Sequence, residues 1–160
     1  MNPWLPVFRR VLLPAVFLVV LLLQTIGVPF IGEELADGFP EYAYLLTPYL
    51  AVVSAGFVCV QVGVAAAWSL AGLASRGKLY TAAAVKRAAV MAAANGAATV
   101  LALLLAGHLH YVVGEGNPAS LFAFGSAILV GLACTMLSIS LRGRLQEGTQ
   151  METAARPEEG

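Results

Sequence analysis

Four long stretches without a charged residue constrain this chain more than any other feature of its sequence. They span residues 11–32, 42–75, 88–114 and 116–141. Each is longer than the roughly 20 residues that an α-helix needs to cross about 30 Å of hydrocarbon. Only 11% of the residues are charged, 59% are apolar, and the mean hydropathy is +0.82. These values exclude an ordinary soluble domain and a nucleic-acid-binding module.

The apolar stretches predict helices rather than strands. Residues 16–23 (VFLVVLLL) are apolar on every face, whereas a strand of a membrane β-barrel alternates apolar and polar residues. We therefore expect an all-α integral membrane bundle of four transmembrane helices in up-down-up-down order, forming one domain over residues 1–145. The predicted spans are 11–31, 48–73, 84–107 and 118–141. Residues 146–160 are polar, and we expect them to form a frayed helical extension that runs into a disordered cytoplasmic tail.

Short local signals predict where the helices begin and end. Side chains that accept hydrogen bonds from a first helical turn stand at Thr47, Thr81 and Asn117, and two of them are followed by a proline. Gly32 and Gly114 stand where a helix commonly ends on a left-handed residue. We therefore expect Thr47, Thr81 and Asn117 to be N-caps, and we expect helices to end at the two glycines.

The charges are divided between the two sides of this bundle. The connections after the first and third spans carry acidic residues without Lys or Arg, whereas the nine basic residues all fall on the other side: Arg9, Arg10, Arg76, Lys78, Lys86, Arg87, Arg142, Arg144 and Arg156. Basic residues accumulate on the cytoplasmic side of membrane proteins. The distribution predicts that both termini are cytoplasmic.

Two carboxamides and two stripes of small residues lie deep in the predicted spans. Gln61 and Asn95 are close to the middles of the second and third spans, where a carboxamide seeks a partner helix or lines a path for a ligand. Small residues recur at one-turn spacing over 92–96 (Ala, Gly) and 127–135 (Ala, Gly, Thr), which permits close approach of helices. The sequence leaves open whether these faces meet each other or another protein.

The residues that usually carry chemistry do not form a recognisable site. Cys59 and Cys134 stand near the middles of spans, where thiolates are unfavourable, and we interpret both as apolar packing residues. His108 and His110 are two residues apart, so on a helix they point to different sides and do not suit one metal ion. We expect no enzymatic activity, no metal site and no cofactor.

The most distinctive segment is the predicted cytoplasmic connection at residues 75–87. It combines a glycine turn, an aromatic residue, a threonine N-cap and four basic residues that can meet anionic headgroups. It serves either as a topological anchor or as a docking site for a partner. The candidate docking residues are Arg76, Gly77, Lys78, Tyr80, Thr81, Lys86 and Arg87.

At this segment the sequence resembles the bacterial domain of unknown function 2975 family. The resemblance rests on Gly77, Tyr80 and Thr81 and on the basic helix start at 85–87 (Val, Lys, Arg). It differs from the family pattern in having Tyr80 for the usual phenylalanine. The resemblance implies a multi-pass protein of the bacterial inner membrane with four spans, and a regulatory partner, since its members are often encoded beside a small helix-turn-helix regulator.

These observations predict a non-enzymatic membrane protein that acts through protein contacts, as a subunit or as the membrane partner of a cytoplasmic regulator. The alternative is a small facilitator or channel for a neutral or amphipathic solute, with Gln61 and Asn95 along its path. The expected surroundings are the lipid bilayer and either further copies of this chain or another membrane or cytoplasmic protein. No nucleic-acid partner is expected.

Overall fold

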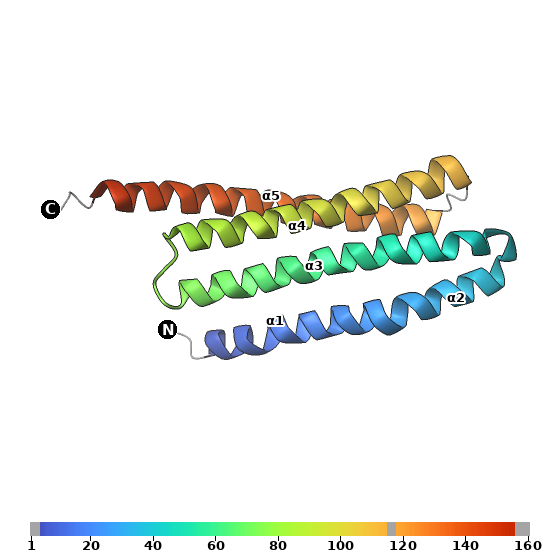
Figure 1. Cartoon of the computed structure of the whole chain (residues 1–160), viewed down its shortest axis with the longest axis horizontal. Helices are drawn as coiled ribbons and strands as arrows, with labels where there is room; N and C mark the ends of the chain where they lie inside the picture. Colours follow the sequence, from blue (N-terminus) through green and yellow to red (C-terminus); the bar gives the residue numbers. More distant parts are fainter. Residues whose placement is uncertain (1–3, 115–117, 156–160) are drawn as a thin grey trace.

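The computed structural model describes residues 4–114 and 118–155, and these residues form long helices that lie side by side (Figure 1). Four helical segments are long and apolar enough to cross a membrane: Val11–Gly38, Pro40–Ala74, Ala82–Val113 and Ser120–Ala154. The expected all-α fold with four spans is therefore present. The elements are α1 (Trp4–Leu22), a π-helical turn η1 (Leu23–Gly27), α2 (Val28–Gly38), a 3-10 helix η2 (Pro40–Leu45), α3 (Leu46–Ala74), α4 (Ala82–Gly107), a π-helical segment η3 (His108–Val113) and α5 (Pro118–Ala155).

The first span is longer than expected and contains a π-helical turn. The turn η1 joins α1 directly to α2. Pro29 follows it and lacks the N–H that would bond to the carbonyl of Thr25, so the widened turn accommodates the proline. The prediction that a left-handed Gly32 ends this span is wrong, because Gly32 lies inside α2. A Cβ at Gly32 would lie 2.7 Å from Leu46 Cδ1, so the glycine permits close packing of α2 on α3.

Of the other predicted helix ends, the one at Gly114 is confirmed and the one at Thr47 is wrong. Gly114 adopts a left-handed conformation with φ 78° at the end of η3, and α5 begins at Pro118. Thr47 is not an N-cap, because η2 runs straight into α3 and places Thr47 inside the first turn. Asn117 lies outside the described residues.

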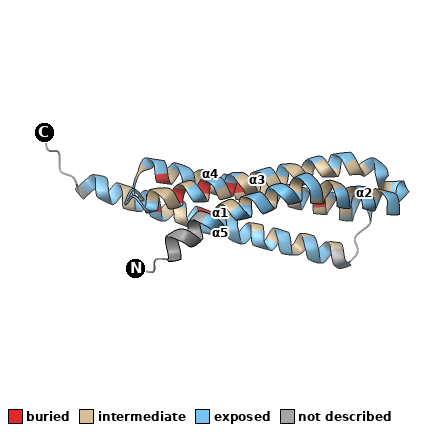
Figure 2. Cartoon of the chain, turned by 90° about the horizontal axis from the view of Figure 1, so that it is seen from below, coloured by how far each residue is buried: buried red, intermediate tan, exposed pale blue. Residues whose placement is uncertain are grey.

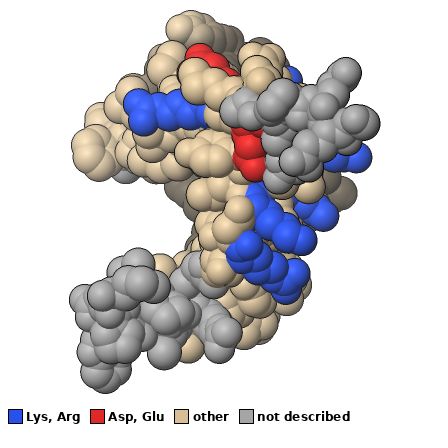
Figure 3. Space-filling view, turned by 90° about the vertical axis from the view of Figure 1, so that its left-hand side faces the viewer, with Lys and Arg blue, Asp and Glu red and all other residues tan. Residues whose placement is uncertain are grey.

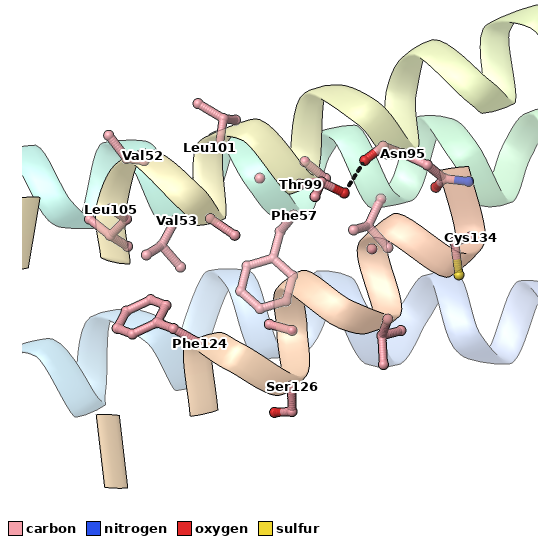
Figure 4. Close-up of a pocket in the computed structure, with 17 residues that line it drawn as sticks. Val52, Val53, Phe57, Asn95, Thr99, Leu101, Leu105, Phe124, Ser126 and Cys134 are labelled. Carbon is pink, nitrogen blue, oxygen red and sulfur yellow. Dashed lines mark hydrogen bonds between the residues drawn. The ribbon is translucent and has the colours of Figure 1, made fainter. Parts of the chain in front are cut away.

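The helices form an open arc in which sequential neighbours pack against each other. The α1 helix packs on α3, α3 on α4, and α4 on α5, so α4 is the central element of the second half (Figure 1). The beginning of α5, before its contact with α4 at Gly131, diverges from the other helices (Figure 2). A cavity of about 590 Å³ lies there between α3, α4 and α5, and the rings of Phe57 and Phe124 extend into it (Figure 4).

Small residues bring α4 and α5 into close contact. A Cβ at Gly131 would overlap the hydroxyl of Thr99, and one at Gly96 would lie 3.7 Å from Thr135 Cγ2. Thr99 donates a hydrogen bond of 2.8 Å to the Asn95 carbonyl, which satisfies its buried hydroxyl within its own helix (Figure 4). The two stripes of small residues therefore face each other inside one molecule. Lipid-facing positions carry large apolar side chains such as Leu129 and Leu137.

The last helix continues well beyond the predicted fourth span. Residues 146–155, where we expected a frayed helical extension running into a disordered tail, are helical throughout and extend α5 to Ala155. The order of this extension depends on an anchor that the sequence pattern does not reveal: Leu145 is only 4% exposed and belongs to an apolar cluster with residues of α3 and α4. The Thr149 hydroxyl donates to the Leu145 carbonyl at 2.7 Å, and the Gln, Glu, Met and Ala residues that follow favour helix.

The contact at Gly131 yields the first testable prediction. Gly131→Leu forces α5 away from Thr99 and lowers the melting temperature of the purified protein in detergent, because overpacking costs about 1–3 kcal/mol. Gly125→Leu is the matched control on the same helix, since a Cβ there meets no atom within 4 Å. Equal melting temperatures for the two variants would contradict the α4–α5 contact.

Candidate docking surface at the basic end

The connection between α3 and α4 is held by backbone hydrogen bonds. The N–H of Lys78 donates to the Leu73 carbonyl at 3.0 Å, and the N–H of Gly77 donates to the Ala74 carbonyl at 3.1 Å. Gly77 has φ 67°, which a side chain would strain. This pair of bonds around a left-handed glycine is the Schellman motif, which satisfies the last carbonyls of α3.

Thr81 closes the other side of the connection, as its sequence position predicts. Its backbone is extended, with φ −129° and ψ 153°, and its Oγ1 accepts a hydrogen bond from the N–H of Ala84 at 3.4 Å. The same hydroxyl donates to the Lys78 carbonyl at 3.0 Å. Thr81 therefore caps α4 and ties the connection to it.

An apolar cluster lies beneath this connection and joins three helices. Its buried members are Leu70 from α3, Ala84 and Ala88 from α4, and Leu145 from α5. Four partly buried residues surround them: Leu73, Leu79, Val85 and Leu141. Removing a leucine side chain from water stabilises a fold by about 1.5–3 kcal/mol. The cluster therefore fixes the connection and the α5 extension to the same base.

Tyr80 packs against the α5 extension at Gly148. A Cβ at Gly148 would overlap the ring of Tyr80, so the absence of a side chain there allows the ring to lie on α5. The tyrosine is still 52% exposed. The position of the aromatic residue in the connection is thus set by a helix almost 70 residues later in the chain, which local sequence patterns do not reveal.

Exposed cations surround this assembly, and Figure 3 shows Lys and Arg gathered at this end. We call it the basic end. The side chains concerned are all exposed: Arg76, Lys78, Lys86, Arg87, Arg142 and Arg144. Four of these cations are predicted docking residues, and the predicted Gly77 and Tyr80 are exposed as well. The remaining predicted docking residue, Thr81, is partly buried as the cap of α4.

Asn95 makes a contact between helices in the middle of the bundle. Its Nδ2 donates to the Ser138 hydroxyl of α5 at 3.0 Å, and that hydroxyl donates to the Cys134 carbonyl at 2.7 Å. A Cβ at Gly63 of α3 would lie 3.0 Å from Asn95 Oδ1. The carboxamide therefore lies where α3, α4 and α5 meet, at one side of the cavity (Figure 4).

Gln61 lies on another side of α3. It precedes Gly63 by two residues, which corresponds to about 200° around a helix. Its Nε2 is buried and has no hydrogen-bond partner within the described part of the chain. The structure therefore does not bring Gln61 to the cavity that Asn95 borders.

The family comparison covers most of the chain and the whole basic end. The family model for proteins of unknown function DUF2975 matches residues 30–154, from α2 to the end of the α5 extension. The chain belongs to this family. The match includes the connection at 75–81 and Gly148, and it confirms the resemblance seen at that connection. Neither a curated protein nor a solved structure matches the chain.

The contact between Tyr80 and Gly148 yields a second prediction. Replacing Gly148 with alanine displaces the ring, so this variant is less stable than Gly143→Ala by about 1–3 kcal/mol although both changes favour helix equally. Gly143 is the control because a Cβ there meets no atom within 4 Å. Chemical unfolding in detergent measures the difference.

The difference should vanish when the ring is absent. In a Tyr80→Ala background, Gly148→Ala and Gly143→Ala should have equal stability, which completes a double-mutant cycle. A difference that persists in that background would show that the Gly148 effect does not pass through Tyr80.

Proposed function

We propose that this protein is a non-enzymatic protein of the bacterial inner membrane that holds a cytoplasmic protein partner at its basic end. Both termini are then cytoplasmic, because the excess of basic residues marks that side. The docking surface consists of Arg76, Gly77, Lys78, Tyr80, Thr81, Lys86 and Arg87.

One observation carries this proposal: the cationic connection is fixed in shape. The Schellman motif at Gly77, the Thr81 cap and the contact of Tyr80 with α5 each remove freedom from the connection. A surface that is ordered before binding loses less conformational entropy on association. A simple topological anchor needs only the charges and no such order.

The chemistry of the surface suggests the partner. Exposed Arg76, Lys78 and Arg87 favour an acidic protein surface, which they attract over several ångströms and orient on approach. The exposed Tyr80 adds an aromatic anchor of the kind that is enriched at protein interfaces. A cytoplasmic regulator with an acidic patch meets both requirements.

The cavity between α3, α4 and α5 supports a second candidate function. A facilitator for a neutral or amphipathic solute would use this apolar space, which Asn95 borders. Gln61 would not contribute to the same path, because it does not line the cavity.

A pull-down of the tagged protein from its native membrane in mild detergent tests the proposal. We expect a stoichiometric protein partner, identified by mass spectrometry. Capture falls about tenfold or more in the fourfold variant Arg76→Gln, Lys78→Gln, Lys86→Gln and Arg87→Gln. Gly77→Val keeps every charge and strains the left-handed position, so it also reduces capture.

The matched control removes four charges from the opposite end: Glu33→Gln, Glu34→Gln, Asp37→Asn and Glu41→Gln. It should capture the partner normally. Capture that survives the fourfold change at the basic end would contradict the docking surface. Recovery of the protein alone as a discrete homo-oligomer would favour the facilitator.

A further inference from the structure

A groove lies at the basic end, between the start of α4 and the extension of α5. It has a volume of about 370 Å³. One face of α4 contributes Ala82, Val85, Lys86 and Ala89, and α5 contributes Arg142, Gln146, Thr149 and Gln150. The groove thus joins two exposed cations from different helices, which the sequence does not bring together.

These two cations lie at the boundary of the hydrocarbon. The charge-free stretch of α4 and η3 begins two residues after Lys86, and the charge-free stretch that includes α5 ends immediately before Arg142. Long cationic side chains at such positions extend toward the headgroups. The groove is therefore at the depth of lipid phosphates.

The polar lining of the groove is suited to an anion. Besides Lys86 and Arg142 it offers the carboxamides of Gln146 and Gln150 as donors, and no carboxylate lines it among the residues that the structure describes. An arginine presents its donors in a fork that matches two phosphate oxygens. The cations are thus available to a ligand.

We propose that this groove binds the phosphate of an anionic phospholipid from the leaflet at the basic end. Val85 lines the groove beside the cations, and Ala89, which lies deeper along α4 than Lys86, faces the first methylenes of the lipid. A lipid satisfies both kinds of lining, whereas a free phosphate leaves the apolar part uncovered. The groove shares Lys86 with the docking surface, whereas Arg142 and the α5 side of the groove are not part of that surface. Arg142→Gln therefore tests the lipid site without changing a docking residue.

Native mass spectrometry of the purified protein, titrated with phosphatidylglycerol and with phosphatidylcholine, tests this proposal. The protein should bind phosphatidylglycerol in preference. Arg142→Gln should weaken that binding about five- to tenfold, since one cation near the membrane surface contributes about that factor. Arg144→Gln is the matched control, because Arg144 is two residues away and does not line the groove.

A second pair of variants keeps the charges and changes only the space. Ala89→Leu fills the groove and should reduce lipid binding, whereas Ala93→Leu, one turn farther along α4 and outside the groove, should not. Equal losses in Arg142→Gln and Arg144→Gln, or equal binding of both lipids, would overturn the proposal. Displacement of the lipid by millimolar inorganic phosphate would also overturn it and assign the groove to a free anion.

Discussion

The close contact between α4 and α5 determines the arrangement of the rest of the functional end. Gly131 lies against Thr99, and Asn95 donates to Ser138, so the two antiparallel helices are held in one register. Each residue advances a helix by about 1.5 Å. Ten residues beyond Ser138 the chain therefore reaches the level of the first turns of α4, where Gly148 meets Tyr80. The contact in the middle of the bundle thus sets where the cationic connection lies.

The stability of the molecule is distributed unevenly along the arc of helices. Most of the buried residues lie on α3, α4 and α5, and the apolar cluster around Leu145 lies at the basic end. In lipid, apolar side chains gain little from packing against each other, so small residues and hydrogen bonds hold the spans together. Where the helices leave the hydrocarbon, burial from water adds to the stability. This explains why the connection between α3 and α4 and the α5 extension are ordered together.

Sequence reasoning succeeded where one segment determines its own structure. The four spans follow from charge-free length, and the Thr81 cap and the left-handed Gly114 follow from the chemistry of single residues. It failed at Gly32 and Thr47, where contact with a neighbouring helix and a preceding 3-10 helix override the local signal. The sequence could not predict the contact of Tyr80 with Gly148 or the groove that Arg142 lines, because both depend on the register of α4 against α5. Gly148, a glycine within the polar tail, was the one sequence feature that hinted at a close contact there.

The central claim is that the connection at 75–81 and the α5 extension form one ordered unit. Hydrogen exchange of the full chain in lipid nanodiscs, resolved along residues 70–90 and 141–155, tests it most directly. The structure predicts that amides of residues 146–155 exchange about 100-fold more slowly than those of an unstructured chain. It also predicts that Tyr80→Ala increases exchange in both segments. Exchange of residues 146–155 at the rate of an unstructured chain, while residues 118–141 remain protected, would contradict the account.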